Sequence, residues 1–132
     1  MASLQIRTGA IRLEIFDDFN ESRGFFVFNP EDVQQAQKAV ELAEQLDVIN
    51  NDFQKRAKEC VTPQEQISLL CEIVDAFEKL IDDCFGEGTS QLVFGDAKSL
   101  GMFYDFFEGV MPYYEKASEN RMAKYKDVKK KK

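Results

Sequence analysis

The sequence of 132 residues contains no histidine and no tryptophan, and only three cysteines and three prolines. Without histidine the chain lacks the commonest general base, the usual metal ligand and every Ser-His or Cys-His pair. Cys60, Cys71 and Cys84 are odd in number and form no C-x-x-C pair, which indicates neither a disulfide framework nor a zinc site. Cys71 and Cys84 share one apolar helical pattern, so we expect both to be small core residues, with a redox-sensing thiol as the alternative.

Long hydrophobic runs are also missing. No apolar stretch approaches the ~20 residues that cross a bilayer, and the first residues lack the basic and apolar blocks of a signal peptide. A chain of this length folds as one domain with a modest core. We therefore expect a single-domain cytoplasmic protein with no membrane partner.

Motifs of catalysis and ligand binding are absent as well. The one glycine-rich stretch, residues 86–89, contains no lysine and does not match a phosphate-binding loop. The acids around Asp17 lack the spacing of a calcium loop, and no G-x-S-x-G nucleophile motif occurs. Adjacent carboxylates such as Asp82 and Asp83 point apart on a helix, so they do not form the paired acids of a hydrolase. We predict a protein that is not an enzyme and that holds no metal and no cofactor.

Charge is distributed unevenly along the chain, whose net charge is −7. Residues 121–132 carry seven basic side chains and one acidic one, which leaves 10 basic and 23 acidic side chains in residues 1–120. A body this acidic repels a phosphate backbone, so we expect no nucleic acid on it. We expect the basic tail to be solvated and disordered, and contact of the tail with nucleic acid or an acidic protein surface is the alternative.

The N-terminal part of the chain has the pattern of β-structure. Residues 11–16 alternate with the period of a strand, and a compact apolar strand follows at residues 25–28. Leu4 and Ile6 form a shorter run that precedes a plausible hairpin turn at Thr8-Gly9. Three short strands need a helix to cover one face, so we expect a small antiparallel sheet packed on helices.

Helix signals begin at residue 29. Asn29-Pro30 supplies an N-cap and a first helical residue, and an apolar stripe continues to Cys60, with residues 50–52 as the expected place for a bend. Thr62-Pro63-Gln64-Glu65 forms a capping box, and the two apolar stripes of the helix behind it indicate a central position. A short helix at residues 91–94 is expected next, between glycine-containing turns.

The last predicted helix, residues 98–120, is unusually aromatic. Its aromatic side chains point all round the helix, because neighbouring positions cannot share one face. Some of this surface should therefore be covered by a second copy or by a partner. The residues expected to contribute to that partner-binding surface, some of which must instead be core, are Phe103, Phe106, Phe107 and Tyr114. The alternative places Tyr104 and Tyr113 at the edge of the core with their hydroxyls in water, and Pro112 predicts a kink.

Together these elements predict an α+β fold. A small N-terminal antiparallel β-sheet packs on a mainly α-helical bundle of three long helices and one short one. The single domain spans residues 1–120, with β-structure over 1–28 and helices over 29–120. Residues 121–132 form the basic tail.

One segment of the chain carries a family resemblance. F-E-K at 77–79 leads to D-C-F-G-E-G-T at 83–89 and then to V-F-G-D at 93–96. This pattern resembles the small tail assembly chaperones of siphophages and of prophages of Gram-positive bacteria. Residues 11–17 are similar to the strand that leads this family, and the helix start at residues 28–30 is similar to one in related phage proteins. The resemblance implies that this segment builds the fold through caps and a tight turn, and its residues are Phe85, Gly86, Gly88, Thr89, Phe94 and Gly95.

The resemblance also implies a function. Such proteins coat the long, helical and hydrophobic tape-measure protein before the tail tube polymerises around it, and they are lost from the finished tail. In many phages a ribosomal frameshift near the end of the gene adds an extension that recruits the tail-tube protein. The ending Lys129, Lys130, Lys131 and Lys132 fits this pattern, because lysine codons are A-rich and can supply a slippery sequence. We expect the tape-measure protein as partner in the cytoplasm of the bacterial host, with self-association left open.

Two rival functions remain open. A structural virion subunit, such as a tail-terminator or connector ring component, would form a closed ring of defined stoichiometry. A nucleic-acid-binding regulator acting through the basic tail would show binding that falls steeply with salt. A hydrolase that uses only aspartate or glutamate is the least supported reading.

Overall fold

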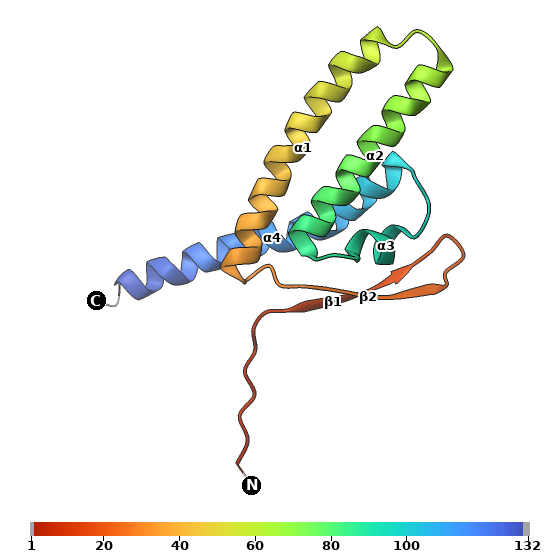
Figure 1. Ribbon diagram of the computed structural model, residues 1–132. Helices are drawn as coiled ribbons and strands as arrows, with labels where there is room; N and C mark the ends of the chain where they lie inside the picture. The colour runs from red at the N-terminus through yellow and green to blue at the C-terminus, as the bar shows by residue number, and fades with distance from the viewer. Residues whose placement is uncertain (1, 131–132) are drawn as a thin grey trace.

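A computed structural model describes residues 2–130 of the chain, and the side chains of residues 2–123. It shows the expected small α+β fold, with a two-stranded antiparallel sheet followed by four helices. The elements are β1 (Ile11–Phe16), β2 (Ser22–Phe28), α1 (Val33–Glu59), α2 (Pro63–Phe85), α3 (Thr89–Phe94) and α4 (Leu100–Lys130). In Figure 1, α1 and α2 form a helical hairpin that rises above the β-hairpin, and α4 passes behind the base of α1 and α2.

The β-hairpin is held by its turn as well as by its register. β1 pairs with β2 from Ile11 opposite Phe28 to Phe16 opposite Ser22, with an irregularity at the last pair. In the turn, Oδ1 of Asp17 accepts hydrogen bonds from the backbone N–H of Phe19 (2.8 Å) and of Glu21 (3.0 Å). The bonds from Glu21 and Phe19 stabilise the charged carboxylate, so they hold the pKa of Asp17 below its ordinary value.

The prediction of a first strand around Leu4 and Ile6 is wrong. Residues 2–10 have no strand or helix, and they lead away from the body as an extended arm (Figure 1). The cause lies at the root of the arm, where Asn29 Nδ2 donates a hydrogen bond of 2.9 Å to the carbonyl oxygen of Thr8. Gly9 follows with φ +90°, and the side chain of Glu31 lies against it. This anchor directs the arm away from β1, so the predicted turn at Thr8-Gly9 does not close a hairpin.

The helix starts are partly as predicted. α1 begins three residues later than expected, because its N-cap is Asp32, whose Oδ1 accepts from Gln34 N at 2.9 Å. The expected cap Asn29 instead accepts from Glu31 N in the preceding turn. α1 continues without a break through residues 50–52, where a bend was expected. The capping box of α2 is present, with Thr62 accepting from the backbone N–H of Glu65 at 3.2 Å.

The core is a cluster of aromatic rings between the sheet and the helices. Phe26 on β2 contacts Phe106 on α4, with ring centroids 5.4 Å apart. One turn earlier on the same side of α4, the ring of Phe103 lies 5.3 Å from that of Phe77 on α2. One side of α4 is therefore packed against both β2 and α2, and α1 adds the buried Leu42 together with half-buried residues further along the helix.

The last helix is longer than expected. α4 runs to Lys130, whereas the sequence predicted an end near Asn120 and a disordered tail. Arg121 is the first basic residue of that tail, and its Nη2 donates a hydrogen bond of 2.9 Å to the carbonyl oxygen of Pro30. The helix also continues through Pro112 without an interruption. Of the lysine ending, Lys129 and Lys130 are the last residues of the helix, and Lys131 and Lys132 lie outside the described residues.

Candidate partner-binding surfaces

The expected partner-binding residues of α4 are mainly core. Phe103 is 0% exposed, Phe106 7% and Tyr114 9%, and Phe107 is half-buried. Some of the four were expected to be core, and Phe103, Phe106 and Tyr114 are those residues, which leaves Phe107 as the partly accessible one. Their spacing places Phe103, Phe106 and Tyr114 near the same side of α4, where the helix meets α2, α3 and the sheet. The alternative for Tyr104 and Tyr113 agrees with the structure, because both side chains are exposed.

The segment with the family resemblance lies at the junction of α2, α3 and α4. The ring of Phe85 lies 5.2 Å from that of Phe26 and 5.6 Å from that of Phe106, and the ring of Phe94 lies 4.6 Å from that of Phe103. Three backbone positions in the segment have positive φ and are glycines: Gly86 (120°), Gly88 (92°) and Gly95 (66°). Side chains other than glycine rarely adopt these conformations, so the glycines permit the two sharp turns around α3.

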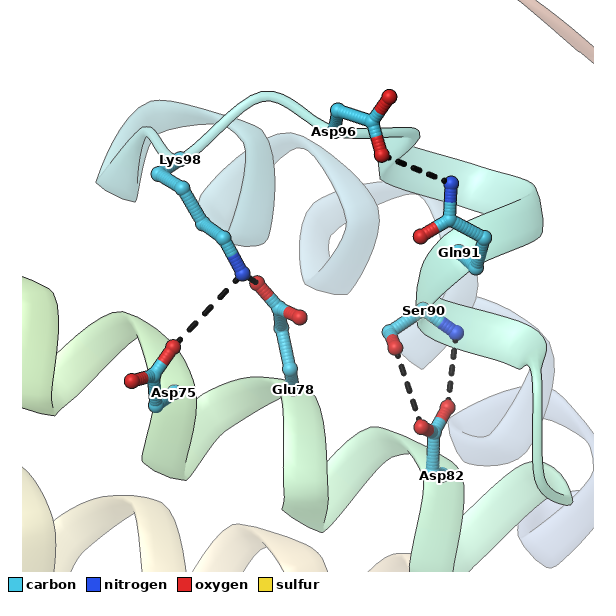
Figure 2. A network of polar contacts seen from close by, with 7 residues as sticks. All are labelled: Asp75, Glu78, Asp82, Ser90, Gln91, Asp96 and Lys98. Atoms are coloured by element: carbon cyan, nitrogen blue, oxygen red, sulfur yellow. Dashed lines mark hydrogen bonds and ion pairs between the residues drawn. The ribbon is translucent and has the colours of Figure 1, made fainter.

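The short helix α3 is capped by a residue that sequence reasoning missed. Thr89 is the first residue of α3, and the N-cap is Gly88, which has no side chain. Asp82 on α2 supplies the cap, because its Oδ1 accepts from Ser90 N at 2.8 Å and its Oδ2 accepts from Ser90 Oγ at 3.1 Å (Figure 2). No pattern along a single helix indicates this contact, since the two residues lie in different helices.

A second polar link ties the start of α4 to α2. Lys98 lies in the connection before α4, and its Nζ is 2.6 Å from Oε1 of Glu78 and 3.7 Å from Oδ1 of Asp75 (Figure 2). The hydrogen bond to Glu78 raises the pKa of Lys98. These groups are largely in water, so the pair positions the connection and contributes little to stability.

One exposed apolar surface is the outer face of the β-hairpin. We call it the outer hairpin face, and it consists of Phe16, Phe25 and Val27 together with Phe19 in the turn. These four side chains are between 48% and 82% exposed. The guanidinium carbon of Arg12 lies 4.6 Å from the centroid of the Phe25 ring, so a cation covers part of that aromatic surface. The signal for this face was present in residues 25–28, because alternate residues of a strand point to opposite faces.

A groove runs between β1 and α4, with a volume of about 600 Å³. We call it the β1–α4 groove. The strand and the turn contribute every residue from Leu13 to Asp18, and α4 contributes Gly101, Met102, Asp105, Phe106, Gly109 and Val110. The groove therefore has an apolar floor and acidic side chains at its rim. Sequence reasoning did not identify it, because the groove depends on how α4 packs on the sheet.

Two titratable side chains, Cys84 and Tyr114, are buried in the core. Cys84 is buried as expected, and burial raises the pKa of its thiol to about 11. The expectation for Cys71 is wrong, because its side chain is exposed. The buried hydroxyl of Tyr114 has no hydrogen-bond partner among the described residues, and burial raises its pKa as well. In the described part of the chain, no three Cys, Asp or Glu side chains are grouped to hold a metal ion.

These features define a small α+β protein in which a β-hairpin, a helical hairpin and a long last helix share one aromatic core. The chain belongs to a family of unknown function, DUF6673, whose model matches residues 24–132. No curated protein and no solved structure matches the chain. Among the described residues, no helix has the length and apolar character needed to cross a membrane.

Proposed function

We propose that this protein is a phage tail assembly chaperone that binds the tape-measure protein during tail morphogenesis and has no enzymatic activity. The resemblance of residues 83–89 and 93–96 to that family supports the proposal. The structural observation that carries it is the outer hairpin face, on which Phe16, Phe25 and Val27 are exposed to water.

The outer hairpin face suits a helical, hydrophobic partner. Exposed apolar surface marks interaction sites in soluble proteins, and on this face it lies beside Arg12 and Glu14, which pair with Val27 and Phe25. A helix with an apolar stripe can bury that stripe against an apolar groove or face. Aromatic rings supply large contact areas without demanding one hydrogen-bond geometry, so successive turns of a long partner could bind in the same way. In this proposal the outer hairpin face takes the role that the sequence assigned to the aromatic residues of the last helix.

The site of action and the extension follow from the same proposal. The protein would act in the cytoplasm of the bacterial host and would be absent from the mature virion. A frameshift in the codons of Lys129, Lys130, Lys131 and Lys132 would add the extension that recruits the tail-tube protein. Sequencing the corresponding gene segment and analysing the expressed products by mass spectrometry tests this part.

The main test is co-expression of the chain with the tape-measure protein of the same phage. The tape-measure protein should become soluble and co-purify with the wild-type chain. The double variant Phe25→Ser/Val27→Ser should lose the complex, because it removes apolar area from the outer hairpin face and leaves the inner face intact. The matched control is Val40→Ser/Val48→Ser, which removes exposed apolar side chains from α1.

The outcomes distinguish the rival functions. If both double variants retain the complex, the outer hairpin face does not bind the tape-measure protein. If the tape-measure protein stays insoluble and the chain purifies as a closed ring, the chain is a virion subunit and the chaperone proposal fails. Binding to nucleic acid that falls steeply with salt would instead favour the regulator.

A further inference from the structure

The N-terminal arm has the properties of a strand that lacks a partner. In residues 2–7 the apolar side chains Leu4 and Ile6 are two positions apart, so they point to the same side of an extended chain. They are 84% and 71% exposed, among the most exposed large hydrophobic side chains of the described residues. Burying them requires contact with another surface, because the anchor at Thr8 directs the arm away from its own body.

The β1–α4 groove offers such a surface. The sheet contains only two strands in the described part of the chain, so the outer edge of β1 has no neighbouring strand. Unpaired backbone groups at such an edge can hydrogen-bond with an added strand. The groove follows β1 from Leu13 to Phe16 and continues along the turn to Asp18, and its floor includes Ile15, Phe106 and Val110.

Two glycines on α4 leave room for a backbone in the groove. Gly101 and Gly109 are eight residues apart and therefore lie on the same face of the helix, with Asp105 between them. A Cβ atom at Gly109 would meet nothing within 4 Å, and one at Gly101 would meet only Ser99 Oγ at 3.7 Å. Glycine weakens a helix interior relative to alanine, and it is typical of places where another backbone approaches closely.

The charges of the arm and of the groove are complementary. Arg7 is the only charged side chain in residues 2–10. The groove carries four acids, of which Asp18 and Asp105 are two, against one base, Arg23. The other two acids are Glu14 and Asp17. A basic arm is therefore attracted to the groove, and an acidic segment would be repelled.

We propose that the N-terminal arm of one copy binds in the β1–α4 groove of a second copy, as a third strand beside β1. The lengths agree, because six extended residues span about 20 Å and β1 itself has six residues. Leu4 and Ile6 would face the apolar floor, and Arg7 would meet the acidic rim. The contact is head-to-tail, so each copy uses its arm on one neighbour and its groove on another.

Mass measurements on the purified full-length chain test the proposal. The wild-type chain should form species larger than a monomer, and their share should rise with concentration in sedimentation velocity. Leu4→Asp/Ile6→Asp should raise the apparent dissociation constant by at least about 100-fold, because it removes the burial of two large aliphatic side chains. Ser3→Asp/Gln5→Asp is the matched control, since it adds the same charge to the other side of the same arm.

A mixing experiment tests the head-to-tail geometry. Gly109→Phe should fill the groove without unfolding the chain, because the added side chain points into open space. This variant keeps its arm, and Leu4→Asp/Ile6→Asp keeps its groove, so each should be monomeric alone. Mixed together, the two should form a one-to-one dimer and no larger species.

Three results would overturn the proposal. The first is a wild-type chain that stays monomeric at all concentrations, as it would if the arm folded back onto its own β1. The second is equal weakening by Ser3→Asp/Gln5→Asp and Leu4→Asp/Ile6→Asp, since only the latter pair faces the groove. The third is a mixture of the two monomeric variants that remains monomeric. Because the test uses this chain alone, its result does not depend on binding to the tape-measure protein.

Discussion

Replacing Phe103 with alanine should destabilise the fold more than any change on the surface of α4. The Phe103 side chain is 0% exposed, and its ring lies 4.6 Å from that of Phe94 and 5.3 Å from that of Phe77. Removing a buried phenylalanine ring loses its burial and leaves a cavity, which together cost about 3–5 kcal/mol. Typical stabilities correspond to roughly 7–20 kcal/mol for a chain of 132 residues. The variant should therefore lose a large part of its free energy of unfolding.

The neighbouring residue provides the control for this experiment. Tyr104 is 52% exposed, so Tyr104→Ala should change the free energy of unfolding by about 0.5 kcal/mol or less. Urea unfolding followed by far-ultraviolet circular dichroism measures both variants, because the chain is mainly helical and contains no tryptophan. If Phe103→Ala lost less than about 1 kcal/mol, or no more than Tyr104→Ala, then Phe103 would not be a core residue. That result would instead support the assignment of Phe103 to a partner-binding surface.

Three further predictions concern a cap, a turn and the thiols. Asp82→Ala should destabilise the chain by about 0.5–2 kcal/mol through the lost cap of α3, whereas urea unfolding of the exposed neighbour variant Asp83→Ala should match wild type. Backbone hydrogen bonds lower the pKa of Asp17 in the folded state, so its contribution is present at neutral pH and is lost as pH falls through that lowered pKa. The urea midpoint of Asp17→Asn should consequently fall less on acidification than that of wild type. A thiol reagent followed by mass spectrometry should label Cys71 in the native protein and Cys84 only on unfolding, because Cys84 is buried with a pKa of about 11.

Local signals predicted most of the elements but not all of their boundaries. The capping box at Thr62 places the start of α2 correctly, because its two members, Thr62 and Glu65, lie within four residues of each other. Asn29 and Asp32 are both good N-caps, and the choice between them depends on the contact of Asn29 with Thr8, which lies 21 positions away. Such a contact is invisible to a pattern read along a single helix, and so is the capping of α3 by Asp82.

The faces of the helices were harder to predict than the helices themselves. Cys71 and Cys84 are 13 positions apart in the same pattern, yet Cys71 is exposed although its neighbours Leu69 and Ile73 are buried. Thirteen positions turn a helix by about 220°, so the two cysteines face different sides of α2. The helical hairpin of α1 and α2 extends beyond the sheet, so residues toward its tip have fewer neighbours (Figure 1). For α4 the opposite holds, because one side of this helix packs against both the sheet and α2 and thereby buries aromatic residues that the sequence assigned to a partner.

The β-hairpin carries large apolar side chains on both of its faces. Residues 25–28 form a continuous apolar run, which is typical of strands covered on both faces. In this chain the inner residues Phe26 and Phe28 are buried against α4, whereas the outer residues Phe25 and Val27 face water. The strand edge beside β1 is open as well, and the arm that could cover it points away from the body. The outer hairpin face and the β1–α4 groove share Phe16, whereas Phe25 and Val27 lie outside the groove. A helical partner bound over Phe25 and Val27 would therefore leave the groove open to the arm of a neighbour.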